Sequence, residues 1–190
     1  MGKFSLKETG FEGLFEITPK VFEDGRGYFM ETYNKKDFEN IGIKNEFIQE
    51  NQSKSKKGTL RGMHFQLENT QAKLVKCIQG AVYDVVVDLR AKSMTYGKWY
   101  GTFLTDKNKR MLMIPKGFAH GFLVMTNEAE FSYMCDDVYN SEAECGIKWD
   151  DPLIGIKWPN LEEMNLVISE KDKKWESIFE LEKNGTISHL

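Results

Sequence analysis

The sequence has little cysteine and no cysteine pair at metal-binding spacing, which limits the chemistry available to it. The 190 residues contain three cysteines, Cys77, Cys135 and Cys145, and none of them forms a C-x-x-C pair. An odd number of cysteines without that spacing argues against a disulfide framework and against a cysteine-rich zinc site. We therefore expect a protein of the reducing cytoplasm.

Long hydrophobic runs are also missing. No window approaches the ~20 consecutive apolar residues that a membrane-spanning helix needs, and the first residues, Met-Gly-Lys-Phe-Ser-Leu, contain no apolar signal-peptide segment. We expect a protein that is neither secreted nor bound to a membrane.

A cluster of basic residues is the third missing feature. The net charge is −3, and acidic and basic residues are interspersed, so no basic stripe indicates a nucleic-acid partner. The nearest approach to one is Lys54, Lys56 and Lys57, which Gly58 follows directly. We interpret this run as a solvated turn.

The composition does provide a core, because 41% of the residues are hydrophobic and 13% are aromatic. A chain of this length and composition is expected to form one domain, with a short appended arm. At the N-terminus, two short strands at 13–18 and 28–33 flank a turn rich in glycine and aspartate, so this region is a hairpin or an arm. A short helix is expected at 35–40, ended by Gly42.

Short strands separated by turn residues dominate the middle of the chain. They are expected at 47–51, around Arg61 and His64, and at 73–78, 81–89, 99–104, 110–114, 120–125 and 131–137. This spacing favours a β-sandwich or a barrel, and the absence of alternating helices argues against a doubly wound parallel sheet. In 81–89 the alternation predicts one face on a core and the other facing water or a polar cavity.

The strand pattern ends after Asp150, where Pro152 and Pro159 interrupt the chain. A small polar helix is expected at about 170–181. Residues 184–190 are expected to be a frayed tail, in which His189 is exposed and has no role.

The chemistry is expected in the stretch 60–73, which contains Arg61, His64, Gln66 and Lys73. Histidine is the side chain whose ordinary pKa suits acid and base catalysis near neutral pH. Cupin metal sites use an H-x-H pair, but Gln66 stands where the second histidine would be, and Lys73 would repel a metal. A metal-dependent oxygenase is therefore a weak alternative.

Several cationic or polar side chains accompany His64. Arg61, Lys73 and His120 supply positive charge or hydrogen-bond donors, and Tyr133 lies on a strand that can face the same cavity. Arginine and lysine are the natural partners of phosphate. The group predicts a site for an anionic ligand, and it favours a functional role for His64 over a structural one.

Separate motifs lie along the chain from about Gly13 to Asp172, at 49–53, 58–66, 73–75, 84–90, 114–122, 146–152 and 169–172. In this order they resemble the motifs of the dTDP-4-dehydrorhamnose 3,5-epimerase family. The chain departs from the family pattern mildly, at Glu50, Met63, Phe65 and Lys148. None of these differences removes a catalytic group.

The resemblance implies an all-β, cupin-type double-stranded β-helix, or jelly roll, with a few short peripheral helices. It implies a metal-free homodimer without a cofactor, acting on a dTDP-4-keto-6-deoxy sugar. We expect a single cupin domain in 1–190, with an N-terminal arm at about 1–33, a jelly-roll core at about 34–140 and a C-terminal segment at about 141–190. The arm, near 22–29, is expected to help build the neighbouring subunit's site.

The resemblance also assigns roles to residues. His64 matches the general base, Asp172 the carboxylate that orients it, Tyr133 the general acid, and Lys73 a cation near the ketone oxygen. Tyr139 matches a residue that stacks near thymine. The positions that match contacts to the sugar nucleotide, Tyr139 included, are Arg26, Glu31, Gln49, Asn51, Arg61, His120, Tyr139, Glu144 and Lys171.

The implied reaction inverts C3 and C5 of dTDP-4-dehydro-6-deoxy-D-glucose to give dTDP-4-dehydro-L-rhamnose. A C3-only epimerase or a ketoisomerase of a related sugar shares this framework and remains an alternative. A cupin that binds the sugar nucleotide without turning it over is a further alternative. The joint presence of His64, Asp172 and Tyr133 disfavours it.

Overall fold

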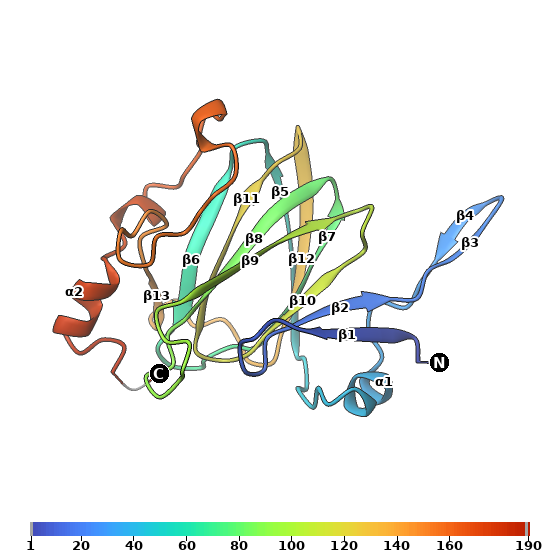
Figure 1. The fold of residues 1–190 in the computed structure, drawn as a ribbon, viewed down its shortest axis with the longest axis horizontal. Coiled ribbons are helices and arrows are strands. Elements are labelled where there is room, and N and C mark those ends of the chain that lie inside the picture. The colour runs from blue at the N-terminus through green and yellow to red at the C-terminus, as the bar shows by residue number, and fades with distance from the viewer. Residues whose placement is uncertain (1, 189) are drawn as a thin grey trace.

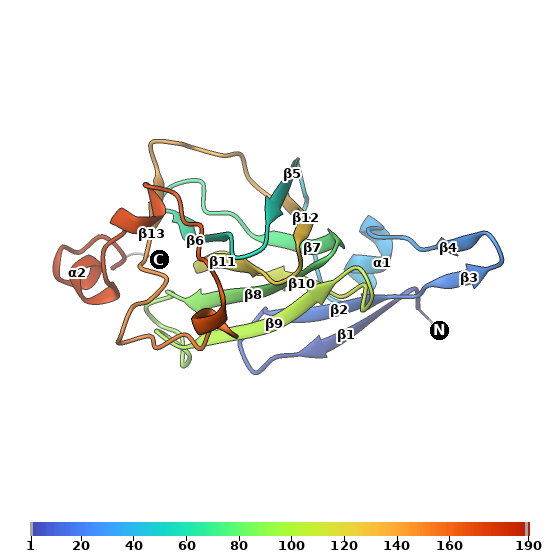
Figure 2. The ribbon, with the colours of Figure 1, turned by 90° about the horizontal axis from the view of Figure 1, so that it is seen from above.

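Two antiparallel sheets packed face to face form the body of the molecule (Figures 1 and 2). The structure is a computed structural model that describes residues 2–188 and 190. One sheet has the order β1-β2-β10-β7-β12-β5 and the other the order β13-β6-β11-β8-β9. From β6 to β13 the chain crosses repeatedly between the sheets, as in a jelly roll. The predicted all-β, cupin-type fold class is confirmed.

The strands agree with the predicted positions through the middle of the chain. The first sheet contains β1 (Phe4–Glu8), β2 (Phe15–Pro19), β10 (Met111–Ile114), β7 (Lys73–Gln79), β12 (Glu128–Cys135) and β5 (Gln49–Lys56). The second contains β13 (Glu144–Gly146), β6 (Leu60–Gln66), β11 (Phe118–Val124), β8 (Ala81–Asp88) and β9 (Trp99–Thr105). The helices are α1 (Lys35–Asn40) and α2 (Ile178–Lys183), with short 3-10 turns at Leu161–Glu163 and Asp172–Lys174.

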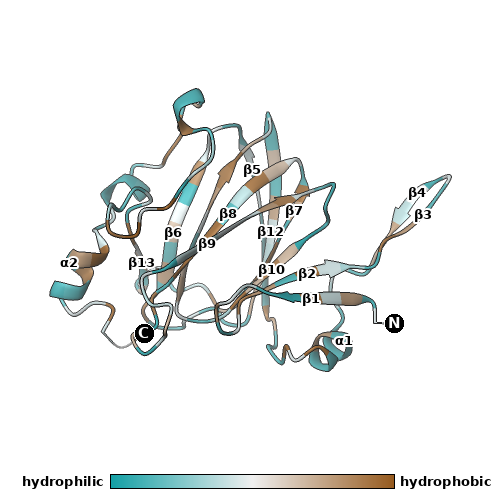
Figure 3. Ribbon diagram, in the orientation of Figure 1, coloured by the Kyte–Doolittle hydropathy of each residue, from teal (hydrophilic) through white to brown (hydrophobic). Residues whose placement is uncertain are grey.

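Both faces of β8 are buried, contrary to the expectation that one would meet water or a polar cavity. Val82 and Val86 pack between the sheets, whereas Val85 and Val87 pack against a second cluster that includes α2 and the segment before it. Hydrophobic stretches accordingly lie along β8 and β11 (Figure 3). The C-terminal segment covers the outer face of the five-stranded sheet, which explains why apolar residues occupy both faces of this strand.

The C-terminal segment is more tightly packed than predicted. In place of one helix at 170–181, a 3-10 turn is followed by extended backbone at Trp175 and then by α2, whose N-terminus Ser177 and Glu180 close with a capping box. Ile187 is buried and Leu190 packs on the same core. The expectation of a frayed tail is therefore wrong for these residues, and His189 lies outside the described residues.

The lysine run also differs in structure from the solvated turn that was expected. Residues 49–56 pair with β12 along their whole length, so Lys54 and Lys56 lie in a strand and not in a solvated turn. Alternate residues of β5 point outward, and Lys54 bonds Glu128 across the ladder at 2.9 Å. Polar residues at alternate positions suit a strand at the edge of a sheet with one face in water, and lysine is common at such positions.

At the N-terminus a small hairpin projects from the body (Figure 1). It consists of β3 (Phe22–Asp24) and β4 (Gly27–Phe29), which pair with each other and form a separate two-stranded sheet. β1, which was not predicted, and β2 belong to the six-stranded sheet. The helix at 35–40 is confirmed, and the Asn34 side chain caps it. Among the described residues, no helix is long and apolar enough to cross a membrane.

Candidate active site

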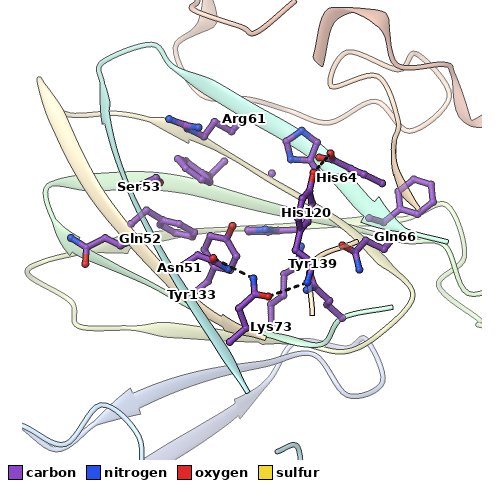
Figure 4. Close-up of a pocket in the computed structure, with 17 residues that line it drawn as sticks. Asn51, Gln52, Ser53, Arg61, His64, Gln66, Lys73, His120, Tyr133 and Tyr139 are labelled. Atoms are coloured by element: carbon purple, nitrogen blue, oxygen red, sulfur yellow. Dashed lines mark hydrogen bonds between the residues drawn. The ribbon is translucent and has the colours of Figure 1, made fainter. Parts of the chain in front are cut away.

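A cavity of about 440 Å³ opens between the two sheets (Figure 4). Its walls come from β5, β7 and β12 on one side and from β6 and β11 on the other. It collects most of the predicted site residues, namely Gln49, Asn51, Arg61, His64, Lys73, His120, Tyr133, Tyr139 and Glu144. The jelly roll thus brings together side chains that are up to 95 positions apart in the sequence, from 49 to 144.

His64 and Asp172 form a hydrogen-bonded pair at the cavity wall. The Nε2 atom of His64 lies 2.8 Å from Oδ1 of Asp172, and the Gly62 N–H donates to the other carboxylate oxygen at 3.3 Å. Burial opposes ionisation of Asp172, but its bonds to His64 and Gly62 hold the pKa of this carboxyl below its ordinary value. The pair fixes one ring nitrogen of His64 and leaves Nδ1 for the cavity.

Tyr133 and Lys73 face the same space from the other sheet. His64 belongs to β6, whereas Lys73 and Tyr133 belong to the neighbouring strands β7 and β12. Burial raises the pKa of the Tyr133 phenol, so the phenol is protonated at neutral pH. Burial lowers the pKa of the Lys73 ammonium, and the charges of Cys135, Glu144 and Asp84 act against this shift. The arrangement puts an imidazole and a protonated phenol on opposite walls.

A chain of polar contacts closes one end of the cavity. The Tyr139 hydroxyl donates to Glu144 at 2.6 Å, and the Lys171 ammonium bonds the other oxygen of that carboxylate at 2.7 Å. The Tyr139 N–H donates to the side-chain oxygen of Gln49 at 3.0 Å, and Gln49 in turn donates to Asn51 at 3.2 Å. These contacts hold an exposed tyrosine ring at the rim, where it can stack on a flat ligand group.

Arg61 supplies an exposed positive charge at the cavity. Its guanidinium donates to the Ser55 hydroxyl at 3.0 and 3.1 Å, and no carboxylate neutralises it among the salt bridges of the described residues. A guanidinium held by a neutral partner is suited to bind phosphate oxygens.

Two predicted residues lie away from this cavity within the chain. Arg26 is at the tip of the β3–β4 hairpin and pairs with Asp24 at 2.7 Å. Glu31 follows the hairpin and pairs with Lys3 at 2.9 Å. The sequence motif therefore groups Arg26 and Glu31 with the site, but the fold of one chain does not bring them to it.

The sequence reasoning missed several side chains around the cavity. Gln52, Ser53, Gln71 and Phe131 line it, and Gln66, noted in the sequence without a role, accepts from the Asn140 N–H at 2.9 Å and donates to the Asn69 carbonyl at 2.7 Å. Asp84 lies behind His120, with Oδ2 2.8 Å from its Nε2. An aspartate inside the apolar run Val-Tyr-Asp-Val-Val-Val was the available signal, since a buried charge needs a partner.

Among the described residues, 2–188 and 190, no three histidine, cysteine, aspartate or glutamate side chains converge as a metal-binding group. The two histidines at the cavity each use Nε2 to bond an aspartate.

Proteins of similar sequence and fold include several named dTDP-4-dehydrorhamnose 3,5-epimerase. A curated relative named dTDP-4-dehydrorhamnose 3,5-epimerase, from Methanothermobacter thermautotrophicus, is 48% identical over 95% of this chain and 97% of its own. The crystal structure of a Legionella pneumophila dTDP-6-deoxy-D-glucose-3,5-epimerase in complex with dTDP-4-keto-L-rhamnose has a TM-score of 0.88, with 43% identity over 92% of each chain.

A more distant solved structure is that of an enzyme with a narrower reaction. It is a 3'-monoepimerase from Streptomyces bikiniensis in complex with dTDP-quinovose, with a TM-score of 0.86 and 28% identity over 93% of this chain and 89% of its own. The model of the family described as dTDP-4-dehydrorhamnose 3,5-epimerase matches residues 8–180. With nearly the whole chain matched and identity near one half, this protein belongs to the dTDP-4-dehydrorhamnose 3,5-epimerase family.

Proposed function

We propose that the chain is a dTDP-4-dehydrorhamnose 3,5-epimerase, which inverts C3 and C5 of dTDP-4-dehydro-6-deoxy-D-glucose to give dTDP-4-dehydro-L-rhamnose. The observation that carries the proposal is the opposition of His64 and Tyr133 across one cavity, each from a different sheet. Inversion at carbon needs a proton removed from one face and a proton delivered to the other. The relatives and their bound sugar nucleotide supply the substrate class.

His64 is the base in this reaction. A carbon beside the C4 ketone loses its proton to Nδ1, because Nε2 is held by Asp172. The electron pair left on carbon moves toward the ketone and forms an enolate. The buried carboxylate of Asp172 stabilises the imidazolium that results and keeps the ring oriented.

Lys73 and Tyr133 complete the step from the opposite sheet. The Lys73 ammonium is in place before the reaction and stabilises the negative charge that develops on the ketone oxygen. The Tyr133 phenol then protonates the carbon on its other face. The cycle leaves a phenolate and an imidazolium, and exchange of protons with water restores both groups.

The nucleotide part of the substrate occupies the rim. Arg61 faces the diphosphate, Tyr139 stacks on thymine, and Gln49, Asn51 and Glu144 bond polar groups of the ligand. Arg26 and Glu31 join from a second copy of the chain, since the hairpin that carries Arg26 extends away from its own cavity. The assembly proposed is a homodimer.

We also propose a single domain and a cytoplasmic location. The three buried clusters share strands of the same two sheets, which supports a single cupin domain over 1–190. The thiols of Cys77, Cys135 and Cys145 are free, which supports a cytoplasmic location. The scheme requires no cofactor, nucleic acid or membrane, because the protein's own side chains supply each proton and charge.

Epimerisation at C3 alone is the second candidate. The 3'-monoepimerase of Streptomyces bikiniensis shares the fold, so the fold does not separate the two outcomes. The higher identity to proteins named as 3,5-epimerases favours inversion at both carbons.

Proton NMR of dTDP-4-dehydro-6-deoxy-D-glucose incubated with the protein in deuterated water tests the proposal. Deuterium at both C3 and C5, absent with His64→Ala, is the expected result. Label at C3 alone assigns the protein to the C3-only epimerases. No label at either carbon contradicts the proposal and favours a binding protein.

A further inference from the structure

A second histidine–aspartate pair lies beneath the cavity. The Nε2 atom of His120 is 2.8 Å from Oδ2 of Asp84, the same separation as between His64 and Asp172. His120 on β11 stands directly opposite His64 on β6 in the strand register. Asp84 on β8 is fully buried and does not line the cavity, whereas His120 does.

Asp84 has an unusual charge environment. Its second oxygen, Oδ1, has no hydrogen-bond partner among the described residues. The charged groups that act on Asp84 are His120 from β11 and Lys73 from β7. Burial raises the pKa of the Asp84 carboxyl, and both of these neighbours oppose that shift. A buried carboxylate is costly unless a partner compensates its charge, and His120 is the side chain that bonds Asp84 directly.

Asp84 and Lys73 each favour the charged form of the other. Lys73 forms no salt bridge within 4.0 Å among the described residues, and its ammonium lies 5.9 Å from the centre of the Tyr133 ring. The negative groups that favour its charged form are Cys135 from β12, Glu144 from β13 and Asp84 from β8. Glu144 already binds Lys171, and burial raises the pKa of the Cys135 thiol to about 11, so this thiol is neutral near pH 7. Asp84 is thus the carboxylate in this group that no lysine or arginine binds directly.

We propose that Asp84 is a positioning residue of this epimerase: it holds the His120 ring with Nδ1 toward the cavity, and its carboxylate compensates the charge of the Lys73 ammonium. The inference rests on the proposed function and deepens it. Without Asp84 the His120 ring would be free to turn, and the ammonium of Lys73 would lose its proton at lower pH. The enolate oxygen would then face a neutral amine.

Asp84→Asn tests the proposal, because asparagine keeps the size and an acceptor oxygen but removes the charge. We expect kcat to fall roughly 10²-fold, the scale of losing one preorganised electrostatic contact, while KM changes little. The alkaline limb of the kcat profile should move to lower pH, because Lys73 loses a negative neighbour. A loss of fold alone would lower the amount of active enzyme and leave the shape of the profile unchanged.

Asp88→Asn is the matched control. Asp88 lies on the same strand and the same face and is also fully buried, but it bonds Arg90, Ser93 and Thr95 away from the cavity. We expect this variant to melt at lower temperature and to retain the wild-type kcat and pH profile. Identical behaviour of the two variants would overturn the proposal.

Nitrogen NMR of the histidine rings gives a measurement that needs no variant. The chain has three histidines, so His120 can be assigned by comparison with His120→Asn. In the wild type we expect Nε2 of His120 to carry a proton and to resist exchange with water. A ring protonated only on Nδ1 would overturn the proposal. An inactive wild type would refute the epimerase reaction itself, whereas an active wild type with an unaffected Asp84→Asn would refute only the role of Asp84.

Discussion

At the scale of the residue, His64 and Tyr133 differ in their surroundings. His64 is 28% exposed at its side chain and is fixed by an ionised carboxylate, which suits a group that takes up a proton. Tyr133 sits among buried neighbours that keep its phenol protonated. A hydrogen-bonded imidazole that faces a protonated phenol across one cavity is an arrangement suited to proton transfer.

Tyr133→Phe should separate proton removal from inversion. We expect inversion to fall by roughly 10²–10⁴-fold, the range for losing a general acid. Deuterium should still enter the sugar, because His64 can remove a proton and return a deuteron to the same face. Product formation and isotope content, followed together by NMR, check this. Loss of both signals to the same extent would show that Tyr133 is not the separate proton donor.

Asp88 provides a residue-scale prediction about stability. Burial opposes its ionisation, but bonds from Arg90, Ser93 and Thr95 hold the pKa of the Asp88 carboxyl below its ordinary value of 3.8. A lowered carboxyl pKa stabilises the fold above the unfolded pKa, and this stabilisation is lost as pH falls through the folded pKa.

Asp88→Asn should therefore lower the free energy of unfolding by about 2 kcal/mol at pH 7, the scale of hydrogen bonds to a charged group. Urea unfolding of both proteins at pH 7 and at pH 3 checks the prediction. The difference between them should shrink at the lower pH, and a difference that grows there would contradict the assignment.

The individual site residues were predictable only where a motif or a rare residue type singled them out. Histidine is scarce, so His64 and His120 were conspicuous, and their surroundings were read from short phrases of sequence. Gln71 and Ser53 carry no such signal, because uncharged polar residues are common on strands and either face can be wet. Asp84 was visible as a charge in an apolar run, but its partner His120 is 36 positions away, and sequence alone does not give that pairing.

At the scale of the element, the loop between β12 and β13 carries Tyr139 and is tied to the body by amide side chains. Gln66 bonds Asn69, Val138 and Asn140, which lie in the loops that follow β6 and β12. Gln71 bonds the Asp137 carbonyl at 2.9 Å. Side-chain amides that satisfy loop backbone groups hold the loop in one position.

Gln66→Leu should disturb this loop without touching the reacting carbon. Because half-buried backbone groups of the loops lose their partners, about 1.4 kcal/mol of binding is expected to be lost, which corresponds to a roughly tenfold higher KM with kcat nearly unchanged. Gln79→Leu, on an exposed position of β7, is the control for added hydrophobicity. Steady-state kinetics separate the two, and a large fall in kcat would mean that Gln66 acts on the chemistry.

The elements themselves followed from the sequence where periodicity and turn residues agreed. The helix at 35–40 has a capping residue, an apolar contact at Phe38 and a glycine after its end, and its bounds match the prediction. The predicted strand at 47–51 ends before β5 does, because the lysines that follow resemble a turn, although β12 pairs with β5 as far as Lys56. The C-terminal tail looked polar, and the burial of Ile187 depends on a distant sheet face that local sequence does not reveal.

At the scale of the whole molecule, the β3–β4 hairpin exposes several aromatic side chains. Phe29 is 68% exposed, and Phe22 and Tyr28 are exposed beside it. Adjacent exposed aromatic side chains on a projecting hairpin are typical of a surface that another protein covers. β1 and β2 belong to the main sheet, so a deletion of residues 1–33 would damage the fold and would not test the arm by itself.

Subunit complementation tests the arm without any deletion. If Arg26 serves the partner's cavity, a mixed dimer of Arg26→Ala and His64→Ala contains one cavity with both residues intact, because the His64→Ala chain donates its Arg26. Neither variant alone has such a cavity. Random mixing after reversible dissociation makes half of the dimers mixed, with one of two sites intact, so about a quarter of wild-type activity should return. If Arg26 serves its own chain, each cavity of the mixed dimer lacks one of the two residues and activity stays at the level of the separate variants. Size-exclusion chromatography with differently tagged chains confirms that mixed dimers form, and mixed dimers without recovered activity would refute the exchange of arms.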